Sequence, residues 1–340
     1  MSNQNKLTMT EEKEEQEEES TTITLSPPPS FNRNGHLFNK EDTFSDLDFI
    51  IAGLEKPLKL HKTIISQTSK LAEGILKAKQ ASNSADSNKI EWMFDTSKEV
   101  DREALVKVLR FCYGDTITVD ANDGECCAVI AALFRLQVIC AADTVAKLSS
   151  FAIEQTKTNL RVGVELLMAT LRYPECSNTD FCALDKQLAE IVLSKERIQE
   201  HYDTVVDRCL MRLPPTFLDI AHFGEPHTKL SEFTVRARYV RYHSESLSQK
   251  EKEDIVKKCD LNTFMSAELN QLNQLEIVER EKLTALYHTV LERTEKDVND
   301  LHIRVMNTQR ESEKTRQKDR RTIARLESII QGLRTTVRLL

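Results

Sequence analysis

His61 and Lys62 are adjacent residues whose types could do chemistry, because an imidazole beside a cation can act as a general base. The pair lies in LDFIIAGLEKPLKLHKTIIS, residues 47–66, where an alternating apolar pattern changes to a helical one. Acid–base or nucleophilic chemistry also needs an oriented carboxylate or a nearby Ser or Cys nucleophile, and the neighbouring sequence supplies neither in a recognisable pattern. We therefore predict a structural role for His61.

A second group of candidate residues has part of the spacing of a zinc finger. Cys209, His222 and His227 have twelve and four residues between them, as in the second half of such a site. The first half is missing, because the positions that should hold another cysteine, 204–206, are Thr, Val and Val. A structural zinc ion is normally bound by four ligands. We predict no metal site, a core cysteine and two loop histidines.

The basic stretch RQKDRRTIAR, residues 316–325, could bind nucleic acid, because a basic helix that leads into a zipper is how bZIP proteins hold the major groove. Asp319 and the nearby Glu313 dilute the positive charge, and the stretch contains no asparagine to bind a base edge. We interpret it as a polar helix surface, and nucleic-acid binding stays the least favoured alternative.

Enzymatic motifs are missing from the sequence. The chain has eight glycines and contains no GxGxxG, no GxxxxGK[ST] and no GxSxG, and HExxH does not occur. Few loops of this chain can wrap a cofactor or a phosphate group. We predict that the protein is not an enzyme, has no catalytic residues and binds no cofactor.

The composition is that of an intracellular globular protein. Of 340 residues, 40% are hydrophobic and 30% are charged, which allows roughly two domains with extended segments. The most apolar run, AVIAALF at 128–134, ends at Arg135, well short of the roughly 18 to 20 residues of a membrane span. The start has no signal-peptide pattern, so we expect eight reduced thiols and a cytoplasmic location, with the nucleus as the alternative.

Residues 1–43 have the composition of a disordered acidic arm. They contain EEKEEQEEES followed by TTITLSPPPS, and they carry nine acidic and four basic side chains. A like-charge run with three consecutive prolines cannot bury enough apolar surface to offset the entropy of ordering. We predict a solvated tail here, with a docking tail for a basic partner as the alternative.

A mixed pattern of strands and helices begins at Phe44. Leu47, Phe49 and Ile51 alternate with Asp48 and Ile50, and the alternation resumes at 58–60 after a turn, which predicts a β-hairpin. Apolar spacing then predicts a helix over 61–80, a short strand at 90–94 and a helix over 101–114. A short strand, TITV, and two helices, 125–138 and 141–155, follow.

This order, together with its motifs, resembles the BTB (POZ) domain. The matching stretches are FSDLDFII, LHKTIISQTS, LVKVLRFCYGDTITV and CAVIAALFRLQVICAADTVAKLSSFAIE. They cover about residues 44–155, and they occur in the order in which the family has them. The resemblance implies an α+β fold, a short sheet with a helical cluster, that forms homodimers.

The resemblance also implies roles for individual residues. His61, Ile64 and Tyr113 match core positions of the family, with His61 ordering the junction between hairpin and helix. The positions that match the dimer interface are Asp46, Leu47, Phe49 and Lys62, and of these Asp46 and Lys62 match positions of a charged groove.

Residues 156–275 are predicted to be entirely helical. In TNLRVGVELLMATLRYP, apolar residues recur at steps of four, three and four, and the prolines that follow fall between such runs. The position of these residues and their helical pattern are similar to those of the BACK helical region that often follows a BTB domain. By this resemblance, the region is a spacer between the dimer and whatever lies beyond it.

The last segment, 276–340, is predicted to form a coiled coil. Its end has aliphatic residues at steps of three and four, with β-branched residues at one heptad position and leucine at the other, which favours two parallel strands. The seam consists of Ile323, Leu326, Ile330, Leu333, Val337 and Leu340. A fainter seam contains Leu291, Val298, Leu301 and Val305. Residues 308–322 contain no aliphatic residue, so the coil is predicted to be discontinuous.

Together these features predict a non-enzymatic homodimeric scaffold for protein–protein interactions, which pairs through its BTB-like part and its coil. The alternative, implied by the resemblance, is a substrate adaptor of a cullin-type ubiquitin ligase. Such adaptors often carry an apolar-x-Glu motif just after the first long helix, and ILKAKQASNS has no glutamate there. A cullin is therefore a second candidate partner, beside an unknown protein bound by the tail. No membrane partner is expected.

Overall fold

The computed structural model describes residues 21–31, 34–40, 45–82, 86–139, 141–180, 182–224, 228 and 231–339, and its side chains are described as far as Ser328. The acidic run at 11–20 lies outside the described residues, as do His227 and the side chains of the predicted seam from Ile330 onward.

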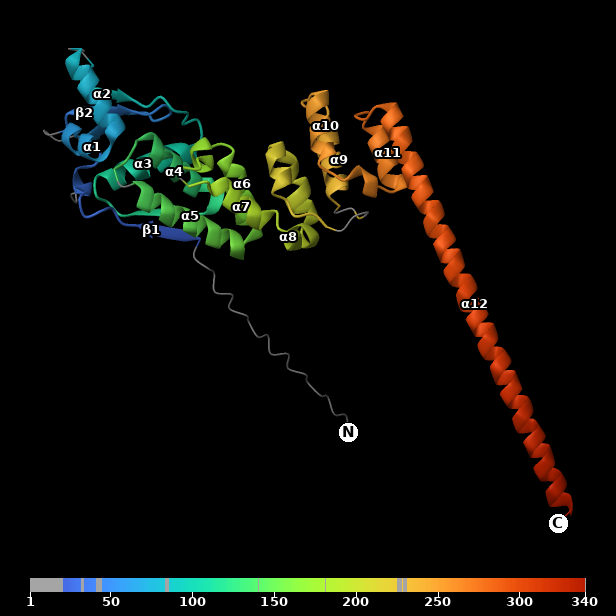
Figure 1. The fold of residues 1–340 in the computed structure, drawn as a ribbon. Coiled ribbons are helices and arrows are strands. Elements are labelled where there is room, and N and C mark those ends of the chain that lie inside the picture. The colour runs from blue at the N-terminus through green and yellow to red at the C-terminus, as the bar shows by residue number, and fades with distance from the viewer. Residues whose placement is uncertain are drawn as a thin grey trace, which may run out of the picture. The chain divides into compact units, whose positions relative to one another are not determined.

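The chain folds as two compact units, Met1–Phe223 and Gly224–Leu340. The predicted spacer over 156–275 is therefore shared between the two units. In the first unit the α-helices are α1 (Lys62–Thr68), α2 (Lys70–Ala81), α3 (Glu99–Cys112), α4 (Glu125–Arg135), α5 (Ala141–Thr158), α6 (Leu160–Thr170), α7 (Leu184–Val192) and α8 (Lys195–Glu200). In the second they are α9 (Glu232–Tyr242), α10 (Gln249–Lys257), α11 (Ser266–Gln274) and α12 (Arg280–Leu339) (Figure 1).

The first unit contains a three-stranded sheet of order β3-β2-β4. Strand β2 (Leu47–Ile50) pairs antiparallel with β3 (Leu58–Leu60), as the hairpin pattern predicted, and parallel with β4 (Lys89–Glu91). The alternation in β2 has its expected effect, because Leu47 and Phe49 are buried while Asp48 and Ile50 are half-buried.

A second, two-stranded sheet corrects the prediction for residues 1–43. Strand β1 (Thr22–Leu25) pairs antiparallel along its whole length with β5 (Ile117–Asp120). Leu25 is buried, and so are Phe31 and Phe38 farther along. The described part of the predicted arm is thus ordered. Its apolar residues contact residues almost a hundred positions away in the sequence. Local composition carries no information about such distant contacts.

The helix predicted over 61–80 is divided at Ser69, another correction. The Ser69 side chain accepts a hydrogen bond from the Ala72 backbone N–H and caps α2. Its hydroxyl also donates to the Leu136 carbonyl at 2.6 Å. Next to it, the Lys70 backbone N–H donates to Gln137, so the chain breaks the helix to pair with the segment after α4.

Helix α4 lies at the centre of the first unit, with α3, α5, α6 and β5 packed around it (Figure 1). Its sequence, ECCAVIAALFR, is apolar on all sides, and every residue from Glu125 to Leu133 is buried. A helix that is hydrophobic all round is expected inside a domain.

The second unit consists of helices as far as the structure describes it, with α9, α10 and α11 leading to the 60-residue α12. The fold is therefore α+β, with small sheets in a mostly helical N-terminal part and a long C-terminal helix. Among the described residues, no helix combines the length and apolar character needed to cross a membrane.

Candidate interaction sites

His61 lies at the junction between β3 and α1, where it contacts Tyr113 at the end of α3. The His61 backbone N–H donates to the Tyr113 hydroxyl at 2.6 Å, and its ring Nδ1 lies 3.3 Å from the same oxygen. Both residues are buried, and the Phe38 ring packs edge-on against Tyr113. Ile64 is half-buried, whereas its neighbour Ile65 is fully buried and takes the core position predicted for Ile64.

Of the four predicted interface residues, only the charged pair reaches the surface. Asp46 accepts a hydrogen bond from the Lys62 backbone N–H at 2.8 Å, so its carboxylate caps the first turn of α1. The Lys62 ammonium donates to Asn88. The side chains of Leu47 and Phe49 are only 2% and 1% exposed within a single chain, and their place at a dimer interface stays a prediction.

Three buried thiols in the described part of the chain are protected rather than reactive. Burial raises the pKa values of Cys112, Cys209 and Cys259 to about 12. A thiolate is the reactive form of cysteine, and at neutral pH these groups are protonated.

The incomplete zinc pattern does not form a cluster in the described part of the chain. Cys209 is fully buried, whereas His222 is exposed. Within the described ranges, no three His, Cys, Asp or Glu side chains converge in a way that could hold a metal ion.

An apolar groove runs between α2 and the end of β4. It has a hollow of about 80 Å³, and its lining includes Leu71 and Ile75 from α2 and the run Trp92, Met93 and Phe94. The Met93 side chain is 87% exposed and Phe94 is 40% exposed. Since β4 is an edge strand of its sheet, this apolar surface is accessible to another protein.

An ion pair fixes the rim of this groove. The Arg135 guanidinium lies over the Phe94 ring, 4.9 Å from its centroid, and Arg135 Nε donates to the Glu175 carboxylate at 2.7 Å. Both charged side chains are largely buried. Breaking a buried ion pair leaves an uncompensated charge, so Glu175 keeps the Arg135 guanidinium in place. The guanidinium in turn holds the Phe94 ring on which it lies. The alternation in IEWMF predicts only a short strand, although this run carries the most exposed residues of the groove.

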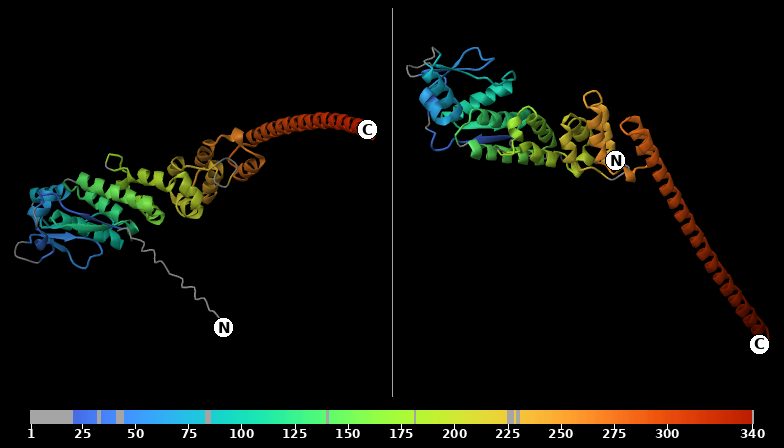
Figure 2. Two further views of the ribbon diagram at one scale, coloured as in Figure 1. Left: turned by 90° about the horizontal axis from the view of Figure 1, so that it is seen from below. Right: turned by 45° about the horizontal axis from the view of Figure 1, so that its top comes forward.

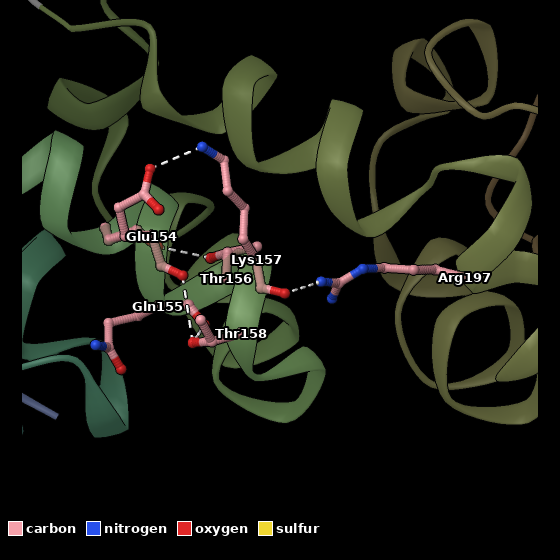
Figure 3. A network of polar contacts seen from close by, with 7 residues as sticks. Glu154, Gln155, Thr156, Lys157, Thr158 and Arg197 are labelled. Atoms are coloured by element: carbon pink, nitrogen blue, oxygen red, sulfur yellow. Dashed lines mark hydrogen bonds and ion pairs between the residues drawn. The ribbon is translucent and has the colours of Figure 1, made fainter. Parts of the chain in front are cut away.

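A polar network joins α5 to α8 in the first unit (Figure 3). The Arg197 guanidinium donates to the Lys157 carbonyl at 2.7 Å, near the end of α5. Thr156 and Thr158 donate their hydroxyls to carbonyls of the preceding turn. A cation near the C-terminal end of a helix interacts favourably with the helix dipole. We therefore infer that this network stabilises the fold.

Helix α12 presents apolar side chains to solvent. Every described side chain from Thr294 to Ser328 is exposed. The exposed apolar residues include both predicted seams as far as they are described: Leu291, Val298, Leu301, Val305, Ile323 and Leu326. Aliphatic residues at heptad spacing on an exposed helix are the usual surface of a coiled coil.

No protein-family model matches this chain, and no curated protein matches it.

Proposed function

We propose that this protein is a non-enzymatic, homodimeric scaffold for protein–protein interactions. In this proposal the first unit is a BTB-type module, and α12 pairs with α12 of a second copy. The observation that carries the proposal is the exposed row of aliphatic residues on α12. A helix of 60 residues is about 90 Å long, and pairing removes its apolar stripe from water.

The first unit supports the BTB part of the proposal through its topology. The hairpin of β2 and β3, its place in a short sheet, and the burial of His61 against Tyr113 agree with what the resemblance implies. The adjacent helices α4 and α5 agree with the closing helical pair.

The test is the molar mass of the full chain by light scattering over a dilution series. We expect twice the chain mass of 39.0 kDa. A monomer throughout the series would refute the proposal. Two matched variants locate the contact on α12, since Leu301 on the seam and Ile303 off it are 61% and 56% exposed. L301K should dissociate at higher concentrations than the native chain, whereas I303K should behave like the native chain.

The groove beside α2 favours a second candidate, a substrate adaptor of a cullin-type ubiquitin ligase. This groove is lined by Leu71 and Ile75 in the first half of α2, a few turns before the position at which BTB adaptors often carry their apolar-x-Glu motif. Calorimetric titration of the full chain with the N-terminal region of the cullin that serves BTB adaptors tests the idea. Binding at about micromolar affinity, roughly 8 kcal/mol, that is lost in M93E would support it. A folded chain that gives no heat would exclude it and leave the scaffold proposal standing.

A further inference from the structure

The middle of α12, residues 308–322, contains no aliphatic side chain, and the sequence alone predicts an interruption of the coil there. Two columns of residues nevertheless run through it at intervals of seven, and together we call them the long seam. One column is Leu291, Val298, Val305, Ser312, Asp319 and Leu326, and the other is Thr294, Leu301, Thr308, Thr315 and Thr322.

The long seam is almost free of charge on a highly charged helix. Seventeen of the thirty-six residues from Leu291 to Leu326 are charged, yet Asp319 is the only charged residue among the eleven seam positions. Residues at two such columns, three and four apart, form one continuous stripe on a helix. The stripe that carries Leu291, Val298, Leu301 and Val305 therefore continues through the middle as far as Leu326, and Ile323 lies one position beside it.

Threonines supply apolar surface in the middle of the stripe. The hydroxyls of Thr308, Thr315 and Thr322 each donate to the carbonyl four residues earlier, at 3.0 Å. Thr294 does the same at 2.8 Å. Because the helix itself accepts each hydroxyl hydrogen, these side chains need no acceptor from a partner and can pack through their methyl groups.

Apart from Asp319, the charges of the middle segment lie beside the stripe or on the opposite face. In the heptad frame of the long seam, Arg310 and Lys314 occupy outer positions, and Glu311 and Arg316 flank the stripe on its two sides. When two such helices pair in parallel and in register, Glu311 lies opposite Arg316 of the second copy. This pair occurs twice in a two-fold dimer, and both contacts are attractive.

We propose that α12 pairs with α12 of a second copy along one uninterrupted seam from Leu291 to Leu326, in parallel and in register. This inference rests on the proposed homodimer and adds the register and the continuity of its coil. The aliphatic run that begins at Ile323 sets the orientation, because parallel pairing places it against itself. A strict seven-residue repeat also requires the helix to wind gently around its partner, and Figure 2 shows that α12 curves along its length.

An antiparallel pair centred near residue 306 is the competing arrangement. It would place Arg304 opposite Glu311 and Asp297 opposite Lys318, so its charges also match. It would, however, leave the run from Ile323 onward without an aliphatic counterpart on the other copy. The two arrangements differ in the neighbour of Thr315, which is Thr315 of the second copy in the parallel pair and Val298 in the antiparallel one.

Disulfide trapping in the full-length chain distinguishes these cases. T315C puts a thiol on the long seam, and the matched control Q317C puts one on the outer face of the same turn. After the molar mass of each variant has been recorded, each is treated with oxidised glutathione and compared with the native chain, whose described cysteines are buried or half-buried. We expect T315C to form the covalent dimer at least about tenfold faster than Q317C, because a parallel seam holds its two sulfurs at high effective concentration.

Each outcome has one meaning. Fast trapping of T315C alone supports the continuous parallel seam. A dimer in which T315C reacts no faster than Q317C overturns the seam but leaves the homodimer intact. If V298C combined with T315C traps rapidly while T315C alone does not, the pair is antiparallel and the inference is wrong. A monomeric mass refutes the proposed function itself.

Discussion

Substitution of Tyr113 by Phe removes one oxygen from the core of the first unit and keeps the ring. The Tyr113 ring is fully buried and packs edge-on against Phe38, 5.4 Å between centroids, so the packing should survive. The lost hydroxyl accepts the backbone N–H of His61 at 2.6 Å. A buried N–H left without its acceptor costs about 1 to 3 kcal/mol, and we expect Y113F to lower the free energy of unfolding by that amount.

The assay follows urea unfolding by the fluorescence of Trp92, the single tryptophan of the chain, which is buried in the first unit. Y173F is the matched control. It removes the same atom from a buried ring, but the group that loses its hydrogen bond is the half-buried Asp101 carboxylate, which water can hydrate instead. The reasoning is refuted if Y113F costs less than about 0.5 kcal/mol, or no more than Y173F does.

Three further predictions concern the same unit. Leu25 is buried in β1, so L25A should lower the free energy of unfolding by about 2 to 5 kcal/mol in the Trp92 assay, whereas a disordered arm would give no change. Asp46 caps α1, so D46A should cost about 1 kcal/mol and D46N much less; equal losses would contradict the capping role. Cys112 and Cys209 have pKa values of about 12 in the folded chain against 9.0 for an ordinary thiol, so the stability that they contribute is complete below pH 9 and falls as pH rises toward 12. Urea unfolding followed by circular dichroism should show a shallower fall between pH 9 and 10.5 in C112A, and an unchanged slope would contradict this.

Elements whose residues are close in sequence could be predicted well. The β2–β3 hairpin joins two alternating segments through a short turn, and the buried face of α3, with Leu105, Val108 and Leu109, follows from helical spacing alone. The long helix α12 was predictable for the same reason, since its polar, proline-free sequence carries a seven-residue repeat.

Features that depend on distant partners could not be predicted in this way. The break at Ser69 interrupts a sequence with good helical spacing, because its hydroxyl and the adjacent backbone bond to residues that follow α4. The backbone N–H and C=O groups of β1 find their hydrogen-bond partners in β5. The short apolar run beside three prolines therefore carries no local sign of a strand.

The candidate sites also differ in whether they depend on neighbouring or on distant residues. The apolar repeat on α12 and the alternation that buries one face of β2 follow from the sequence alone, because both are periodic properties of adjacent residues. The enclosure of Leu47 and Phe49 within a single chain and the exposure of Met93 at a groove become visible only in the folded chain. Whether an apolar side chain is covered depends on the elements that pack over it, and these come from distant parts of the sequence.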